Sequence, residues 1–301
     1  MSRFLSIGEA MVELSRAEAG ENDLWRLGFA GDTLNTAWYA RACLPTDWQV
    51  DYLTRLGADP FSARMTEFLT EARIGTSFIT RDPVRSIGLY AIELQDGERS
   101  FSYWRGQSAA RLLAEDGAHL DAAFAAADGI YLSGITLAIL PDAGRDALLS
   151  RLAQARAQGK LTAFDPNLRP KLWENPETMR RWLTAAAQGA RILMPSFEDD
   201  ANWFGDSSLL ACAKRWQAAG AEEIVVKNGG GTMGCLAEDI YREVKVEMLK
   251  PVDTTGAGDS FNGAYLAGRL TGQGCDDALQ RGHAVASQVI ARFGALVPLH
   301  K

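Results

Sequence analysis

Short apolar runs alternate with longer segments of helical periodicity along most of the 301-residue chain. The apolar runs are typical of buried strands and cover residues 4–7, 129–132, 161–164, 192–194 and 224–226. The segments with helical spacing are 33–43, 60–73, 142–158, 176–188, 207–219, 258–270 and 275–293. This alternation predicts an α/β fold with a mainly parallel central sheet, helices on both faces, and ligands at the carboxyl ends of the strands.

The region 86–105 does not follow this alternation of strands and helices. Residues 86–95 and 98–105 alternate like strands and are separated by Asp96-Gly97, which is typical of a two-residue hairpin. The resulting register places Tyr90 opposite Tyr103, with Arg105 further along the same face. Together with residues 11–29, we expect this hairpin to form a small sheet that covers the mouth of a single domain, 1–301. Its free edge favours a homo-oligomer in which a second subunit covers it.

The composition of the chain argues against several classes of function. The chain has 31 Lys+Arg against 38 Asp+Glu and a net charge of -7, which argues against a nucleic-acid partner. We expect no membrane association, because the chain has neither an export signal nor an apolar run long enough to span a bilayer. The four cysteines are widely spaced, which indicates neither a zinc site nor a disulfide framework and favours the cytoplasm.

The strongest chemical signal is the run Asp253-Thr254-Thr255-Gly256-Ala257-Gly258-Asp259, which leads into a helix. Small residues at a helix start let backbone N–H groups approach an anion, and the helix dipole adds to the attraction. We therefore interpret Gly256, Ala257 and Gly258 as an anion hole. Asp259 in the first turn is ordinarily a favourable dipole partner, but beside an anion site it is a candidate general base for an attacking hydroxyl.

This run resembles the second signature of the ribokinase-like (PfkB) carbohydrate kinases. Gly8-Glu9, Gly31-Asp32-Thr33-Leu34-Asn35, Asp165-Pro166-Asn167 and Val225-Val226-Lys227-Asn228-Gly229 follow in the order of that family. The resemblance implies a three-layer sandwich with a small β-sheet lid, a sugar acceptor, and ATP and Mg²⁺ as cofactors. Tyr103-Trp104-Arg105 and Asn167-Leu168-Arg169-Pro170 most resemble the members that phosphorylate 2-keto-3-deoxygluconate on its 6-hydroxyl.

The resemblance assigns a set of sugar contacts, and each has an ordinary structural alternative. Asp32 or Thr33 could simply cap a helix, and the lid tyrosines could be a surface cluster. A keto-acid carboxylate is best bound by the planar fork of an arginine, and Arg169 and Arg105 are the two candidates. The implied sugar contacts are Gly31, Asp32, Asn35, Tyr90, Tyr103, Arg105, Arg169 and Asp259.

The implied contacts with ATP include a Gly-rich loop that could also be an ordinary turn. They are Asn167, Ser196, Lys227, Gly229, Gly231, Gly234, Gly256, Gly258 and His283. Ser196-Phe197-Glu198-Asp199-Asp200 takes the place of a family Asn-x-x-Glu element that is tied to Mg²⁺, but the asparagine is absent, so no single acidic residue is assigned. The family also implies a monovalent cation such as K⁺ near Asp253 and Thr255.

Other functions stay open at this point. A fructokinase or another hexose kinase of the same fold is the nearest alternative, and a non-catalytic sugar or nucleotide sensor is a second. The retained Asp259 and its glycines argue against the sensor. A nicotinamide oxidoreductase is disfavoured because Gly8-Glu9-Ala10-Met11 follows the first predicted strand without the expected glycine fingerprint. A P-loop motif is absent from the sequence as well.

Overall fold

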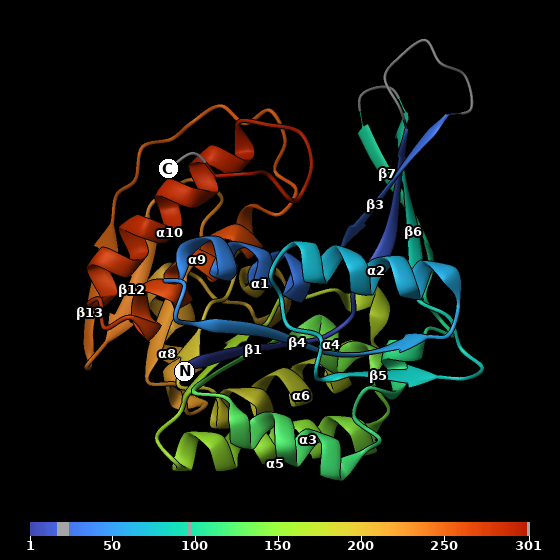
Figure 1. The fold of residues 1–301 in the computed structure, drawn as a ribbon. Coiled ribbons are helices and arrows are strands. Elements are labelled where there is room, and N and C mark those ends of the chain that lie inside the picture. Colours follow the sequence, from blue (N-terminus) through green and yellow to red (C-terminus); the bar gives the residue numbers. More distant parts are fainter. Residues whose placement is uncertain (17–23, 96–97, 300–301) are drawn as a thin grey trace.

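The computed structural model describes residues 1–16, 24–95 and 98–299, and its strands form two separate sheets (Figure 1). The larger sheet has nine strands in the order β13-β12-β11-β10-β9-β8-β1-β4-β5. It is parallel from β5 to β11, and β12 and β13 add an antiparallel edge. Its strands are β1 (Arg3–Ile7), β4 (Gln49–Gly57), β5 (Ile79–Asp82), β8 (Gly129–Ser133), β9 (Leu161–Asp165), β10 (Ile192–Leu193), β11 (Glu223–Val226), β12 (Met233–Ala237) and β13 (Ile240–Val244).

Helices cover both faces of this sheet (Figure 1). Alternate strand residues point to opposite faces, so Phe4 packs in one core while Leu5 and Ile7 pack in the other. On the Phe4 side lie α1 (Asp32–Cys43), α2 (Pro60–Glu71), α9 (Ala257–Leu270) and α10 (Cys275–Ile290). On the other side lie α3 (Gly117–Ala126), α4 (Gly134–Ile139), α5 (Asp142–Ala157), α6 (Pro176–Gly189), α7 (Phe197–Phe204) and α8 (Leu209–Ala218). The predicted three-layer α/β sandwich is confirmed.

The smaller sheet stands away from the main body and forms the predicted lid (Figure 1). Its strand order is β3-β2-β6-β7. The register confirms the hairpin prediction, since Gln95 pairs with Glu98 and Tyr90 with Tyr103. The turn Asp96-Gly97 and residues 17–23 of the lid segment lie outside the described residues. The strands of this sheet are β2 (Met11–Arg16), β3 (Trp25–Ala30), β6 (Gly88–Gln95) and β7 (Glu98–Trp104).

Several elements have no counterpart in the predicted pattern, and β4 shows why. Its sequence carries Asp51 and Thr54, yet both are buried. Arg3 pairs with Asp51 at 3.2 Å, so the strand tolerates a charge that breaks the apolar run. The predicted helices also end slightly differently, since α8 begins at Leu209 and α10 ends at Ile290. Two short 3₁₀ helices, Ala109–Leu112 and Pro170–Leu172, complete the described elements.

Within the described part of the chain, no helix combines the length and apolar character needed to cross a bilayer.

Candidate active site

The site forms where α1 and α9 cross beside the carboxyl ends of the central strands. The two helices approach closely because Gly263 has no side chain: a Cβ there would lie 2.6 Å from the Thr36 carbonyl oxygen. Their first turns are linked by a hydrogen bond of 2.8 Å from Asn35 Nδ2 to Asp259 Oδ2. The crossing therefore brings together two predicted site residues that are 224 positions apart.

Asp259 has the electrostatics of a base that works near neutral pH. Burial raises the pKa of Asp259 to about 7, the neighbouring Asp32 carboxylate adds to the increase, and the hydrogen bond from Asn35 opposes it. Its side chain still retains partial exposure. A carboxylate with this pKa can accept a proton from a hydroxyl at physiological pH.

The start of α9, where the sequence predicts an anion hole, combines a left-handed glycine with open space. Gly256 precedes the helix in the left-handed conformation, with φ 74°. A Cβ at Gly256 would also lie 2.7 Å from the Ala295 carbonyl oxygen, so both the backbone conformation and the lack of space require glycine. At Gly258 the space is open: among the described residues, only Lys227 Nζ comes within 4 Å of a Cβ position there, at 3.6 Å.

Asp32 lies at the start of α1 and faces the loop after β9. Asn167 Nδ2 donates a hydrogen bond of 2.9 Å to Asp32 Oδ2. Burial raises the pKa of Asp32, and a hydrogen bond with the Ser133 side chain opposes the increase. Gly31 lets this turn pack tightly, since a Cβ there would lie 2.4 Å from the Glu9 carbonyl oxygen. The structure thus places Gly31, Asp32 and Asn35 together.

The predicted lid residues Arg105 and Tyr90 are held by Glu9, which the sequence placed in a family segment without a role, and by Glu13, which no sequence pattern indicated. Arg105 forms an ion pair with Glu9, and both side chains are buried. The Tyr90 hydroxyl donates to Glu13. Tyr103 is 52% exposed, its ring lies 5.8 Å from that of Tyr90, and the Arg105 guanidinium lies 6.0 Å from its ring centre. Glu13 meets Tyr90 through the β2–β6 pairing, which is a contact between distant segments with no local signal.

A cavity of about 390 Å³ has Asp259 in its lining. Its apolar wall, which the patterns also missed, is Met233, Val246, Leu249, Pro251, Phe261, Ala286 and Ile290. Gly231 and Gly234 are not among its lining residues; Gly234 lies in β12 opposite Val226. The predicted site residues that line it are Asn167, Arg169, Ser196, Lys227, Gly229, Gly256, Ala257, Gly258, Asp259 and His283.

Of the three consecutive acidic residues at the start of α7, one faces this cavity. Asp199 lines it and lies 3.8 Å from Arg169 Nη1. Burial raises the pKa of Asp199, and Arg169 opposes the increase. Asp200 points into the protein, where Trp216 Nε1 donates to it at 2.7 Å. Asp199 is therefore the acidic side chain of this segment that a bound cation could reach.

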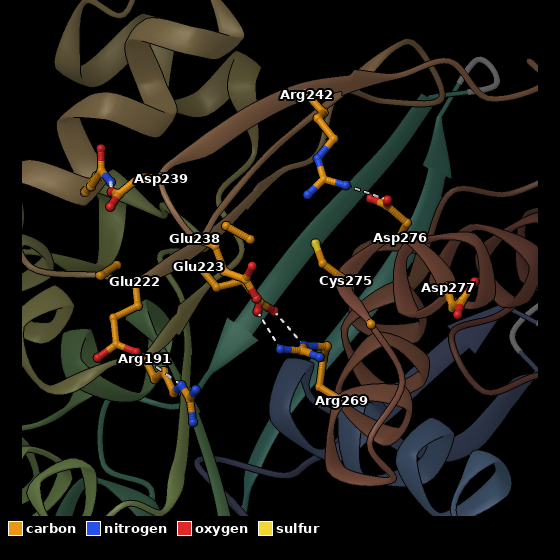
Figure 2. A pocket seen from close by; sticks show the side chains of 14 residues that line it. Arg191, Glu222, Glu223, Glu238, Asp239, Arg242, Arg269, Cys275, Asp276 and Asp277 are labelled. Atoms are coloured by element: carbon orange, nitrogen blue, oxygen red, sulfur yellow. Dashed lines mark hydrogen bonds and ion pairs between the residues drawn. The ribbon is translucent and has the colours of Figure 1, made fainter.

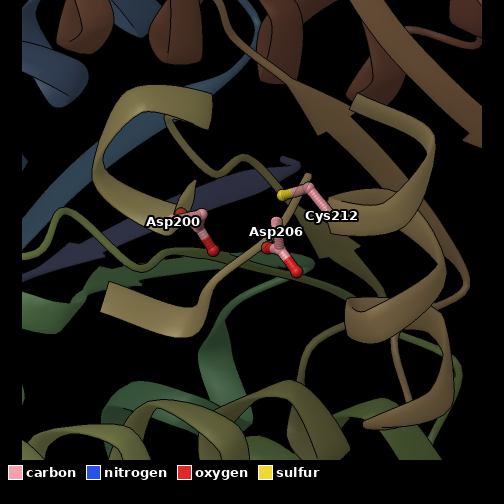
Figure 3. Close-up of side chains that lie close together, drawn as sticks. All are labelled: Asp200, Asp206 and Cys212. Carbon is pink, nitrogen blue, oxygen red and sulfur yellow. The ribbon is translucent and has the colours of Figure 1, made fainter. Parts of the chain in front are cut away.

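Asp200, Asp206 and Cys212 lie close enough to suggest a metal site, because their ligand atoms are within 4.8 Å of one another (Figure 3). Arg215 already occupies the centre of this cluster. Its Nη2 lies 2.5 Å from Asp200 and 2.6 Å from Asp206. The guanidinium thus supplies the positive charge, and the cluster is a buried ion-pair network that joins α7 to α8.

A second depression, of about 720 Å³, lies beyond β12 and the start of α10 (Figure 2). Its arginines are paired with carboxylates: Arg269 with Glu223 at 2.8 Å and Arg242 with Asp276 at 2.6 Å. Its lining shares no residue with the cavity beside Asp259. We interpret it as a charged surface hollow, separate from the site.

Fold and site together define a three-layer α/β protein in which the glycine-containing start of α9, the partly exposed carboxylate of Asp259 and the polar first turn of α1 lie beside one another at the edge of a cavity. The chain belongs to the pfkB family of carbohydrate kinases, whose model matches residues 1–301. The predicted family is confirmed.

Individual relatives refine this placement. The chain is 41% identical to the 2-dehydro-3-deoxygluconokinase of Escherichia coli strain K12, over 97% of this chain and 96% of the relative. It is 29% identical to a fructokinase of Vibrio alginolyticus over 72% of this chain and 69% of the relative. The crystal structure of a Xylella fastidiosa fructokinase with bound ATP is similar in fold, with a TM-score of 0.82 at 23% identity, covering 98% and 94% of the two chains.

Proposed function

We propose that this protein transfers the γ-phosphoryl group of ATP to the 6-hydroxyl of 2-keto-3-deoxygluconate. One observation supports the proposal most: Asp259 stands between a cavity large enough for a nucleotide and the polar face of α1 under the lid, at the start of α9. The near-full-length similarity to 2-dehydro-3-deoxygluconokinase points to the same acceptor, since 2-dehydro-3-deoxygluconate is the same compound.

In this mechanism Asp259 accepts the proton of the 6-hydroxyl as that oxygen attacks phosphorus. A pKa of about 7 makes the carboxylate basic enough for the task while leaving about half of it ionised at neutral pH. Backbone N–H groups of Gly256, Ala257 and Gly258 bind the phosphoryl oxygens as charge develops. The lid lies over the sugar and excludes water, which would otherwise compete as acceptor.

Asp32 and Asn35 orient the sugar hydroxyls, and Gly31 lets their turn pack closely against the backbone of Glu9. Asp32 is an acceptor, and Asn35 already holds Asp259, so the sugar and the base share one hydrogen-bonded network. Tyr90 and Tyr103 contribute aromatic surface from the lid. This combination of polar groups and aromatic surface suits a sugar, whose carbon chain carries several hydroxyl groups.

The carboxylate of the sugar acid is recognised by arginine. Arg105 Nε has no hydrogen-bond acceptor among the described residues, although the side chain is buried, so it has a donor to offer to an incoming carboxylate. Arg169 is about half exposed and lines the cavity near Asp259. These two guanidinium groups favour an acidic sugar over a neutral hexose.

ATP occupies the cavity with its base against the apolar wall and its phosphates toward α9. Mg²⁺ fits the available donors, because a hard cation prefers carboxylate and phosphate oxygens and Asp199 offers such an oxygen in the cavity. The chemistry that Mg²⁺ supplies when bound is neutralisation of charge on the phosphate oxygens. We also propose a cytoplasmic homo-oligomer, with the lid edge as the contact, and a K⁺ site near Asp253 and Thr255.

A fructokinase is the second candidate, supported by the more distant similarity to such enzymes. ADP release measured with 2-keto-3-deoxygluconate, fructose, ribose and gluconate separates the two. We expect kcat/KM for 2-keto-3-deoxygluconate to exceed that for fructose by at least about a hundredfold, as two charge-assisted contacts allow. Equal or higher kcat/KM for fructose would reject the assignment.

A further inference from the structure

Lys227 is held in an unusually well-defined position directly after β11. Its N–H donates to the Pro195 carbonyl oxygen at 2.8 Å, and its own carbonyl oxygen accepts from the Phe197 N–H at 2.8 Å. Its ammonium donates to Asp165 Oδ2 at 2.7 Å and to Asn262 Oδ1 at 3.1 Å. An ammonium has three N–H donors, so these two bonds fix its direction and leave one donor over.

The remaining donor is next to the anion hole. Lys227 Nζ lies 3.6 Å from the position that a Cβ would take on Gly258, in the second residue of α9. The side chain is 14% exposed and lines the cavity. Lys227 also lowers the pKa of both Asp259 and Asp199, so its positive charge acts on both carboxylates.

The charges around the cavity make this position significant. Asp165, Asp199, Glu247 and Asp259 line the cavity, and a triphosphate that enters it would meet four acidic groups. Among the lining residues that the structure describes, Lys227 and Arg169 are the lysine and arginine available to oppose them. Arg169 lies beside Asp199, which leaves Lys227 as the cation nearest to the helix start.

Asp165 does not depend on Lys227 alone. Asn262 Nδ2 donates to Asp165 Oδ2 at 2.6 Å, and the Asn167 N–H donates to Asp165 Oδ1 at 2.9 Å. Because two other donors remain on this carboxylate, the ammonium can turn part of its charge toward a phosphoryl group without leaving Asp165 unpaired. Asp165 and Asn262 therefore act as positioning residues for the lysine.

We propose that Lys227 is a catalytic residue whose ammonium contacts the γ-phosphoryl group of ATP while that group is transferred. This deepens the proposed function and rests on it. The bond between the γ-phosphorus and the β,γ-bridging oxygen breaks, a bond from the γ-phosphorus to the acceptor oxygen forms, and the acceptor proton passes to Asp259. Lys227 stays protonated throughout and offsets the charge on the transferring group.

The test compares Lys227→Gln and Lys227→Arg with Lys214→Gln as the matched control, because Lys214 is an exposed lysine on α8 that donates a hydrogen bond to Gln217. Calorimetry with excess Mg²⁺ and no acceptor gives the affinities for ATP and for ADP. We expect Lys227→Gln to weaken ATP at least about tenfold more than ADP, because only ATP carries the γ-phosphate. Lys227→Arg should keep most of the natural ratio of ATP affinity to ADP affinity, and the control should leave this ratio unchanged.

Turnover provides the second readout. Removing one charge-stabilising donor should lower kcat by about a hundredfold, with the KM for the sugar acid nearly unchanged. The acid limb of kcat/KM should also move to higher pH, since Asp259 loses a neighbouring cation. A purely structural lysine would weaken ATP and ADP equally and would lower the melting temperature; that result, or an unchanged kcat, overturns the proposal. The ratio of the ATP and ADP affinities does not depend on the fraction of folded protein. Because its measurement needs no acceptor, it tests Lys227 even if 2-keto-3-deoxygluconate is the wrong sugar.

Discussion

Replacing Asp259 with asparagine removes the proposed base and leaves almost everything else in place. The amide has the same size, and its oxygen can still accept the hydrogen bond of 2.8 Å from Asn35. General-base catalysis contributes about 10²–10⁴ in rate, so we expect kcat to fall by about a thousandfold. The dissociation constant of the sugar should change by less than about threefold, because the contacts from Asp32 and Asn35 remain.

The pH dependence gives this prediction a second quantity. Burial and Asp32 raise the pKa of Asp259 to about 7, and the proton acceptor must be ionised. The kcat/KM of the natural protein should therefore rise with pH to a plateau above about pH 7, and this limb should be absent from Asp259→Asn. A coupled ADP assay between about pH 5.5 and about pH 9 measures both profiles.

The same shift predicts an effect on stability. The pKa of Asp259 is higher in the folded chain, about 7, than its ordinary value of 3.8. Ionisation therefore weakens the folded state, and stability falls as the pH rises from about 4 to 7. The full difference corresponds to at most about 4 kcal/mol, and about 1–2 kcal/mol is expected because the side chain is partly solvated.

Asp259→Asn should consequently melt at a higher temperature than the natural protein at pH 8 and at a similar temperature at pH 4. The control is Asp277→Asn on α10, an exposed carboxylate away from the cavity, which should leave turnover and pH profile unchanged. An unchanged kcat in Asp259→Asn would refute the reasoning about the base. A loss of stability at pH 8 would refute the reasoning about its pKa.

Further substitutions test the surrounding structure. Gly256→Ala should lower kcat and destabilise the fold by about 1–2 kcal/mol, because alanine resists the left-handed conformation; urea unfolding with unchanged midpoint would contradict this. Arg215→Met should cost about 3–5 kcal/mol by leaving Asp200 buried without its cation, and Asp200→Asn in the same chain should recover part of it. Asp199→Asn should raise the Mg²⁺ concentration needed for half-maximal activity, whereas Glu198→Gln should not. EDTA should leave the melting temperature unchanged, and a drop would mean that the Asp200 cluster holds a metal.

Much of the fold could be predicted because its parallel strands are buried on both faces and show as apolar runs. The runs at β1, β8 and β9 and the hairpin of β6 and β7 are confirmed in their places, and the pairing of Tyr90 with Tyr103 follows from turn geometry alone. β4 could not be predicted this way, since its buried Asp51 depends on Arg3 from a different strand. Pairing between distant segments determines that strand, and no local pattern records it.

The site residues also differ in whether a local sequence pattern or a contact between distant segments determines their place. A short motif carries the start of α9, so Gly256 and Asp259 could be predicted from adjacent residues. Glu9 could not be connected to Arg105 in advance, because their contact exists only after the lid sheet packs against the loop that follows β1. The assignment of Asp199 rather than Asp200 to the cavity likewise depends on which way the first turn of α7 faces.

The identity of the phosphorylated product tests the proposed reaction most directly. After incubation of the protein with ATP, Mg²⁺ and 2-keto-3-deoxygluconate, ³¹P-coupled NMR of the isolated product identifies the carbon that carries the phosphate. One phosphate monoester, on the 6-position, is expected, and Asp259→Asn should form about a thousandfold less of it in the same time. A phosphate at another position, or phosphorylation of fructose but not of 2-keto-3-deoxygluconate, would contradict the proposed reaction.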